Sequence, residues 1–153
     1  MWPLLILGAL VVLAEYYGEQ GGVSLGPVSQ KIQDLAQAIA QAEGYTRGPG
    51  FIPYDYNNPG DLVDSATGQY RRFATADEGF QALYDKLQFD TSGASAIYHP
   101  SMTWQQFAWM WVNGTAPGAN LTHPGDAPDA WAATVAGQLG VDPLSTVAEY
   151  LAS

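Results

Sequence analysis

The sequence predicts a mostly α-helical protein of the α+β class, with a small β-hairpin lobe and a hydrophobic helix at its N-terminus. Three observations indicate this. Apolar residues recur at helical spacing in several segments after residue 29. A stretch rich in Gly, Pro and Asn separates the first of these segments from the rest, and residues 4–14 carry no charge. With 153 residues, 47% of them hydrophobic, the chain can bury one core. We therefore expect one folded domain, residues 29–153.

The first 17 residues are predicted to anchor the protein in a membrane. Neither Lys nor Arg occurs before Lys31, so the basic region of a secretory signal is missing and we expect the segment to be retained. As a helix it reaches about 25 Å, near the lower limit for crossing a bilayer, and aromatic residues flank it as at membrane interfaces. Burial against partner subunits is the alternative. The residues assigned to the anchor are Trp2, Leu5, Leu10 and Tyr16.

Residues 18–28 form a predicted Gly-rich tether between the anchor and the domain. The balance of 15 acidic against 5 basic residues argues against nucleic acid as a partner, because binding to its backbone needs clustered Lys and Arg. The chain has no cysteine, so a disulfide or a thiolate metal site is excluded. His99 and His123 stand beside prolines without a neighbouring ligand pattern. Neither a metal nor a cofactor is predicted.

Helix signals divide residues 29–153 into elements. The first helix is expected from an N-cap at Ser29 to a left-handed end at Gly44. Residues 60–64 and 69–73 are expected to pair as a hairpin. Four more helices are predicted: after the capping boxes that open at Thr75 and Thr103, from Asp126 to Gly140, and over residues 144–151 after Asp142.

Glu43 is the candidate general acid. It falls in the last turn of the first predicted helix, beside the aromatic ring of Tyr45 and in front of the irregular stretch. Burial and the negative end of the helix dipole both disfavour an ionised carboxyl there. A carboxyl that keeps its proton near neutrality can protonate the leaving oxygen of a glycosidic bond. For a second carboxylate, Asp61 and Asp64 of the hairpin are candidates and Asp55 is a weaker one.

Three stretches of the sequence resemble a known family. They are Ala38-Ile39-Ala40-Gln41-Ala42-Glu43-Gly44-Tyr45, Tyr56-Asn57-Asn58-Pro59-Gly60-Asp61-Leu62 and Arg72-Phe73-Ala74-Thr75-Ala76-Asp77-Glu78-Gly79-Phe80. They look like the lysozyme-like muralytic, or peptidoglycan-degrading, enzymes of bacteriophage virions, and are more distantly similar to bacterial glucosaminidases and lytic transglycosylases. The resemblance implies a lysozyme-like fold over residues 29–151 and the catalytic acid role for Glu43. It also implies that the Asn-Asn-Pro-Gly turn and the Phe73 strand position a glycan cleft.

We therefore expect a virion-associated, membrane-anchored enzyme that cleaves peptidoglycan glycan strands during host entry or lysis. Its expected partners are the glycan strands, the lipid membrane through the N-terminal segment, and other virion proteins. A hydrolase needs a second carboxylate, whereas in a lytic transglycosylase the 6-hydroxyl of the substrate attacks instead. The residues assigned to substrate binding are Tyr45, Tyr56, Asn57 and Asn58.

Two other classes of function stay open. A structural protein of a virus particle that keeps the lysozyme-like fold without the chemistry would also use the N-terminal segment to hold a membrane. Cleavage of the peptide cross-link is the weaker option, because the sequence shows neither a metal triad nor a Ser or Cys nucleophile pattern.

Overall fold

The computed structural model describes residues 27–123 and 125–153, and this part of the chain is mostly helical, as predicted. Its elements are α2 (Gln30–Ala42), the 3₁₀ helix η1 (Tyr45–Arg47), α3 (Ile52–Asp55), α4 (Ala76–Thr91), α5 (Trp104–Asn113), α6 (Pro128–Leu139) and α7 (Val147–Ala152). The predicted anchor, residues 1–17, and nearly all of the predicted tether lie outside the described residues. Within the described residues, no helix is long and apolar enough to cross a membrane.

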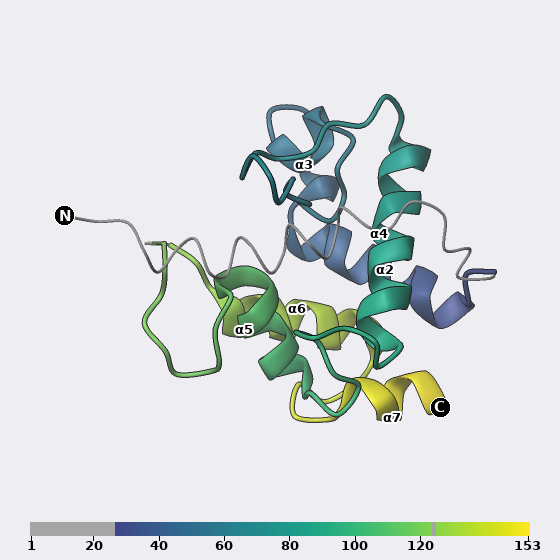
Figure 1. Cartoon of the computed structure of the whole chain (residues 1–153), viewed down its shortest axis with the longest axis vertical. Coiled ribbons are helices and arrows are strands. Elements are labelled where there is room, and N and C mark those ends of the chain that lie inside the picture. Colours follow the sequence, from purple (N-terminus) through teal and green to yellow (C-terminus); the bar gives the residue numbers. More distant parts are fainter. Residues whose placement is uncertain (1–26, 124) are drawn as a thin grey trace.

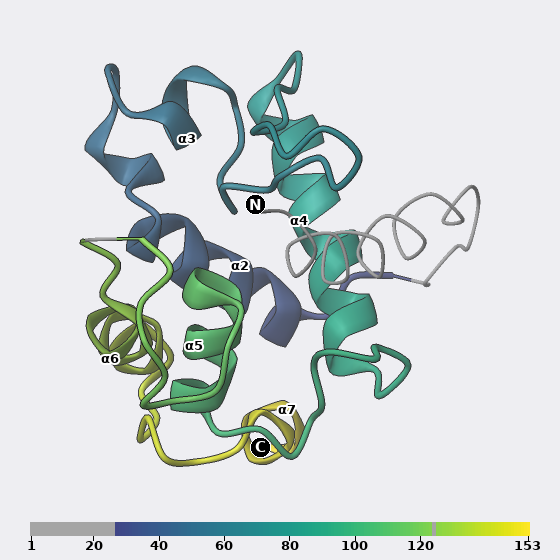
Figure 2. The same cartoon turned by 60° about the vertical axis from the view of Figure 1, so that its left-hand side comes forward.

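The helices α2, α4, α5, α6 and α7 form a bundle, and residues 45–75 form a separate lobe at one end of it (Figure 1). The central helix α2 packs against α6 and α4, and α5 packs against α6. In a second view α2 lies between α4 and the pair of α5 and α6 (Figure 2). The C-terminal end of α2 points towards the lobe in both views. A side chain at that end therefore lies between bundle and lobe.

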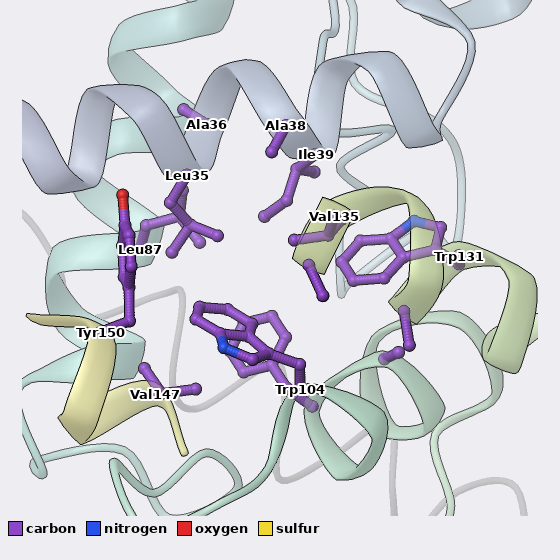
Figure 3. Close-up of a cluster of buried hydrophobic side chains, with 14 of the residues drawn as sticks. Leu35, Ala36, Ala38, Ile39, Leu87, Trp104, Trp131, Val135, Val147 and Tyr150 are labelled. Atoms are coloured by element: carbon purple, nitrogen blue, oxygen red, sulfur yellow. The ribbon is translucent and has the colours of Figure 1, made fainter. Parts of the chain in front are cut away.

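One face of α2 supplies the centre of the core. Leu35, Ala36 and Ile39 are fully buried because they recur at three and four residues along the helix. Figure 3 shows Leu35 and Ile39 pointing at the aromatic residues of α5 and α6, among them Trp104 and Trp131. This packing fixes α5 and α6 relative to the end of α2.

Two predicted helix starts are wrong. Asp126 does not cap α6, which begins at Pro128 with Ala127 in the N-cap position and no side-chain cap. The last helix begins at Val147 instead of residue 144, because Thr146 and Glu149 form a capping box with both reciprocal bonds. Upstream, the Asp142 carboxylate accepts a hydrogen bond from the Leu144 amide, which favours a turn there.

The predicted caps at Ser29, Gly44 and Thr103 are confirmed, and the capping box predicted at Thr75 is half formed. The Ser29 hydroxyl accepts from the amide of Ile32, and Gly44 is left-handed with a φ of 86°. Thr103 and Gln106 form a complete capping box. Thr75 caps α4, but the Glu78 carboxylate accepts from the amide of Ala74 rather than from that of Thr75.

The lobe has hydrogen-bonded turns where the hairpin was expected. Among the described residues there is no strand, and Val63 and Tyr70 form an isolated antiparallel bridge. The bridge is flanked by hydrogen bonds from the Asp64 amide to the Gln69 carbonyl and from the Arg71 amide to the Leu62 carbonyl, both 2.8 Å.

Asn58 organises the lobe from within. Its side chain is fully buried, and its amide nitrogen donates to the carbonyls of Leu62 (2.8 Å) and Arg71 (3.0 Å). Its side-chain oxygen accepts from the Leu62 amide at 2.8 Å. The neighbouring Asn57 side chain donates to the carbonyl of Phe73 at 3.1 Å. The Asn-Asn-Pro-Gly turn is thereby joined to the stretch that leads into α4.

Candidate active site at the end of α2

Glu43 lies at the C-cap of α2, where its carboxyl meets two indole groups. Its amide donates to the Ile39 carbonyl, and Gly44 then turns the chain away from the helix axis. Its Oε1 accepts hydrogen bonds from Nε1 of Trp111 on α5 and Nε1 of Trp131 on α6, both at 2.9 Å. The two indole rings stack with their centroids 6.0 Å apart, so they present their N–H groups to the same oxygen. Glu43 is held by neutral donors.

The surroundings keep Glu43 protonated at higher pH than an ordinary glutamate. Burial is the main cause that raises its pKa, from 4.5 to about 7. The negative charge of Asp61 raises the pKa further, whereas the hydrogen bonds from Trp131 and Trp111 lower it. An indole N–H can only donate, so the two bonds occupy Oε1. The acidic proton is therefore directed to Oε2, which accepts no hydrogen bond from the described residues.

Asp61 belongs to the lobe and lies close enough to Glu43 for its charge to act on that carboxyl. It has a left-handed backbone with a φ of 50°, and its amide donates to the Asn58 carbonyl in a tight turn. Its Oδ1 is buried without a hydrogen-bond partner among the described residues. Burial raises the pKa of Asp61 to about 6. Because the charge of Asp61 also raises the pKa of Glu43, the two carboxyls titrate as a coupled pair.

Tyr70 is a further member of the site that the sequence did not indicate. The charge of Asp61 is the main cause that raises the pKa of its phenol, followed by burial and by the charges of Glu43 and Asp126. All three acids therefore lie within electrostatic reach of one hydroxyl. Tyr70 is 43% exposed, so it also offers an aromatic surface to solvent beside the carboxyl pair. Asp126 brings the segment between α5 and α6 to the same region.

Asp64 and Asp55 are used within the lobe itself. The exposed Asp64 accepts hydrogen bonds at Oδ1 from the amides of Ala66 and Thr67 and from the Thr67 hydroxyl, and these bonds lower its pKa. Asp55 accepts from the amide of Gly50. Both carboxylates stabilise their own turns, whereas the charge of Asp61 acts on Glu43.

The four residues assigned to substrate binding differ in accessibility. Asn58 is fully buried with its hydrogen bonds made inside the lobe, so it has no surface for a ligand. Asn57 likewise donates to backbone carbonyls. The half-buried ring of Tyr56 is covered by the Arg72 guanidinium, 3.5 Å from its centroid. Tyr45 is half-buried and packs edge-on against Phe80.

Sequence reasoning missed the indole donors. Trp111 and Trp131 stand 68 and 88 residues from Glu43, so no short motif links either of them to it. A buried tryptophan needs an acceptor for its indole N–H, and this requirement is the signal that could have found them. The sequence alone does not show which residue is the acceptor.

Two other features bear on the site. A groove with a volume of about 360 Å³ runs along α2, α6 and α7, between residues that include Lys31, Gln41 and Tyr150. Glu43 does not line this groove. In the described part of the chain, no group of three or more His, Asp or Glu is placed to hold a metal ion.

The predicted anchor residues Trp2, Leu5, Leu10 and Tyr16 lie outside the described residues.

Comparison with models of protein families, with curated proteins and with solved structures found no match to this chain.

Proposed function

We propose that this protein is a peptidoglycan-cleaving glycosidase or lytic transglycosylase in which Glu43 is the general acid. The observation that supports this most directly is the Glu43 carboxyl, held at one oxygen by two indole N–H groups and with a pKa raised to about 7. Protonating a leaving glycosidic oxygen requires a carboxyl that is neutral near physiological pH. Both the catalytic role and a lysozyme-like architecture belong to the proposal, supported by the helix, lobe and bundle order.

The mechanism follows from the two carboxyls. Glu43 donates the proton on Oε2 to the oxygen between two amino sugars, and the indole N–H groups stabilise the carboxylate that remains. In the hydrolase scheme, Asp61 stabilises the developing oxocarbenium charge or activates water. In the transglycosylase scheme, the 6-hydroxyl of the substrate attacks and Glu43 takes up its proton. Tyr70 supplies an aromatic surface for a sugar ring.

The setting that we propose is a virion that carries the enzyme on a membrane. The apolar run within residues 1–17 would hold the lipid bilayer, and glycan strands and other virion proteins would be its partners. Cleavage would then open the cell wall during host entry or lysis. A net charge of −10 disfavours nucleic acid as a partner.

The test is Glu43→Gln. The amide keeps a carbonyl oxygen for both indole N–H groups but has no acidic proton, so clearing of purified sacculi should fall by about 10²-fold or more with little change in thermal unfolding. The matched control is Glu149→Gln, an exposed residue whose capping role glutamine can fill. It should clear sacculi like the wild type. Equal clearing by Glu43→Gln would reject the assignment.

Products and pH dependence sharpen the assignment. Mass analysis of soluble fragments distinguishes anhydro-sugar ends, reducing ends and free peptide amines, which identify a transglycosylase, a hydrolase and a peptide-cleaving enzyme. Asp61→Asn should abolish a hydrolase that uses Asp61, while Asp64→Asn should retain most activity. Activity should decline as the pH rises above about 7, where Glu43 loses its proton.

A non-catalytic structural or membrane protein of a virus particle is the second candidate. One observation favours it: the groove that lies along α2, α6 and α7 is not at Glu43. In that case the acid and its indole partners only stabilise the fold, and none of the fragment classes appears in the digest.

A further inference from the structure

A buried ion pair lies behind the indole that holds Glu43. Lys86 and Asp90 are one turn apart on α4, and Nζ of Lys86 lies 2.7 Å from Oδ2 of Asp90. Their side chains are 12% and 1% exposed. Burying such a pair costs desolvation energy for both charges, and an apolar pair of similar size is often at least as stable. The pair therefore calls for an explanation beyond stability.

The ammonium group of Lys86 faces aromatic rings as well as its carboxylate. Its Nζ lies 4.9 Å from the ring centroid of Trp111 and 4.8 Å from that of Tyr98. These distances are within the range of a cation–π contact, which is stronger where water is excluded. The same Trp111 ring donates its N–H to Glu43 at 2.9 Å. Lys86 and Glu43 are thus connected through one indole.

We propose that Lys86 is a positioning residue of the Glu43 site: it holds and polarises Trp111, so that the indole N–H donates more strongly to the Glu43 carboxyl. A cation against the ring draws electron density from it and makes the N–H a better donor. Asp90 fixes the ammonium group, and Phe107 stacks on Trp111 at 5.7 Å to limit its tilt. The effect of Lys86 on catalysis rests on the proposed function. Its effect on the hydrogen bond from Trp111 to Glu43 does not, because that effect is a property of the fold.

The sign of the effect follows from the hydrogen bond. Donation from Trp111 stabilises the carboxylate form and lowers the pKa of Glu43, against the stronger effect of burial. The other groups facing Glu43 are Trp131 from α6, and Asp61 and Tyr70 from the lobe, with Asp126 beyond Tyr70. Lys86 acts on this set through the Trp111 ring, whose centroid lies 4.9 Å from its Nζ. Removing Lys86 should therefore raise the pKa of Glu43 by weakening the hydrogen bond from Trp111.

The experiment measures the pKa of Glu43 by NMR of its side-chain carboxyl carbon, assigned with Glu43→Gln, and the indole N–H signal of Trp111. The main variant is Lys86→Met with Asp90→Leu, which removes both charges together and leaves no lone buried charge. We expect the Glu43 pKa to rise by about half a unit, a roughly threefold gain in proton affinity, and the indole signal to shift towards a weaker hydrogen bond. Lys86→Arg keeps a cation at this position, so its Glu43 pKa and Trp111 indole signal should both stay close to those of the wild type.

Lys31→Met is the matched control. Lys31 also lies over an aromatic ring, with Nζ 4.4 Å from the centroid of Tyr150, but that ring does not contact Glu43. This variant should leave both signals unchanged. A wild-type Glu43 pKa and indole shift in the folded double variant, or an equal change in Lys31→Met, would overturn the proposal.

Two further outcomes are decisive. If the double variant does not fold, Lys86→Gln with Asp90→Asn replaces both charges by neutral amides that can still hydrogen-bond to each other at this spacing, and the same rise in the Glu43 pKa is expected; no displacement overturns the proposal. The experiment measures a pKa and a chemical shift, so it tests the role of Lys86 even if Glu43→Gln clears sacculi normally. That result would reject the enzyme and leave the coupling intact.

Discussion

The bundle and the lobe are stabilised by different interactions. In the bundle, fully buried apolar residues such as Leu35, Ile39 and Val135 pack against aromatic rings. In the lobe, large apolar residues of the α3 region remain exposed, with Ile52 at 43%, and the polar Asn58 is fully buried and makes three hydrogen bonds. The bundle therefore depends on apolar area, and the lobe on a few satisfied polar groups.

This difference bears on the site because its two carboxyls come from opposite sides. Glu43 ends a bundle helix, whereas Asp61 is held in a left-handed turn of the lobe. Apolar packing tolerates small losses gradually, but an unsatisfied buried polar group carries its full desolvation penalty. The geometry of the carboxyl pair should therefore be more sensitive to changes in the lobe than to equal changes in the bundle.

The largest effect is expected at Gly79, where α4 meets the lobe. A Cβ at this position would overlap the backbone carbonyl oxygen of Asn57, and backbone cannot move as a flexible side chain does. Gly79→Ala should destabilise the protein by at least about 3 kcal/mol, the upper end of what overpacking typically costs, because the contact is with backbone. Urea unfolding followed by tryptophan fluorescence measures the change.

Gly137 in α6 is the bundle counterpart. A Cβ there meets nothing within 4 Å, so Gly137→Ala should stabilise the protein by about 0.5–1 kcal/mol through helix propensity. Equal effects of the two substitutions would show that the contact between α4 and the lobe is not tight.

The next effect concerns Asn58. Asn58→Ala removes three hydrogen bonds and leaves the Leu62 amide and the carbonyls of Leu62 and Arg71 without these partners. Unfolding free energy should fall by about 2–4 kcal/mol, because the unsatisfied groups are partly or fully buried. Asn120→Ala, at an exposed position, should change it by less than about 0.5 kcal/mol. Amide exchange in residues 58–71 that stays as slow as in the wild type would contradict a framework role for Asn58.

The sequence was sufficient for features that depend on neighbouring residues. Periodicity and caps located α2 and placed Glu43 at its end, since both signals lie within a few positions. The sequence did not show which of Asp61 and Asp64 belongs to the site. An aspartate three residues before a threonine, as Asp64 is before Thr67, can either stabilise a turn or line a site. The Trp111 and Trp131 donors depend on how α5 and α6 pack at the end of α2, and no local pattern encodes that contact.

The last prediction tests the junction of lobe and bundle through pH. The folded-state pKa of Glu43, about 7, lies above its ordinary value of 4.5, so the folded protein binds the proton more tightly than the unfolded chain. This contribution to stability is fully present below pH 4.5 and is lost as the pH rises through 7. Asp61 has the same sign, with a folded-state pKa of about 6.

Wild-type stability should therefore fall relative to Glu43→Gln by about 2 kcal/mol between pH 5 and pH 8, since the amide does not titrate. Urea unfolding of both proteins at constant ionic strength measures the difference, and the titrating groups that do not interact with Glu43 cancel between them. Asp61→Asn should reduce the wild-type dependence and lower the pKa of Glu43, because its charge opposes ionisation of Glu43. If the unfolding free energies of wild type and Glu43→Gln change with pH in the same way, the bundle and the lobe do not bury the Glu43 carboxyl between them.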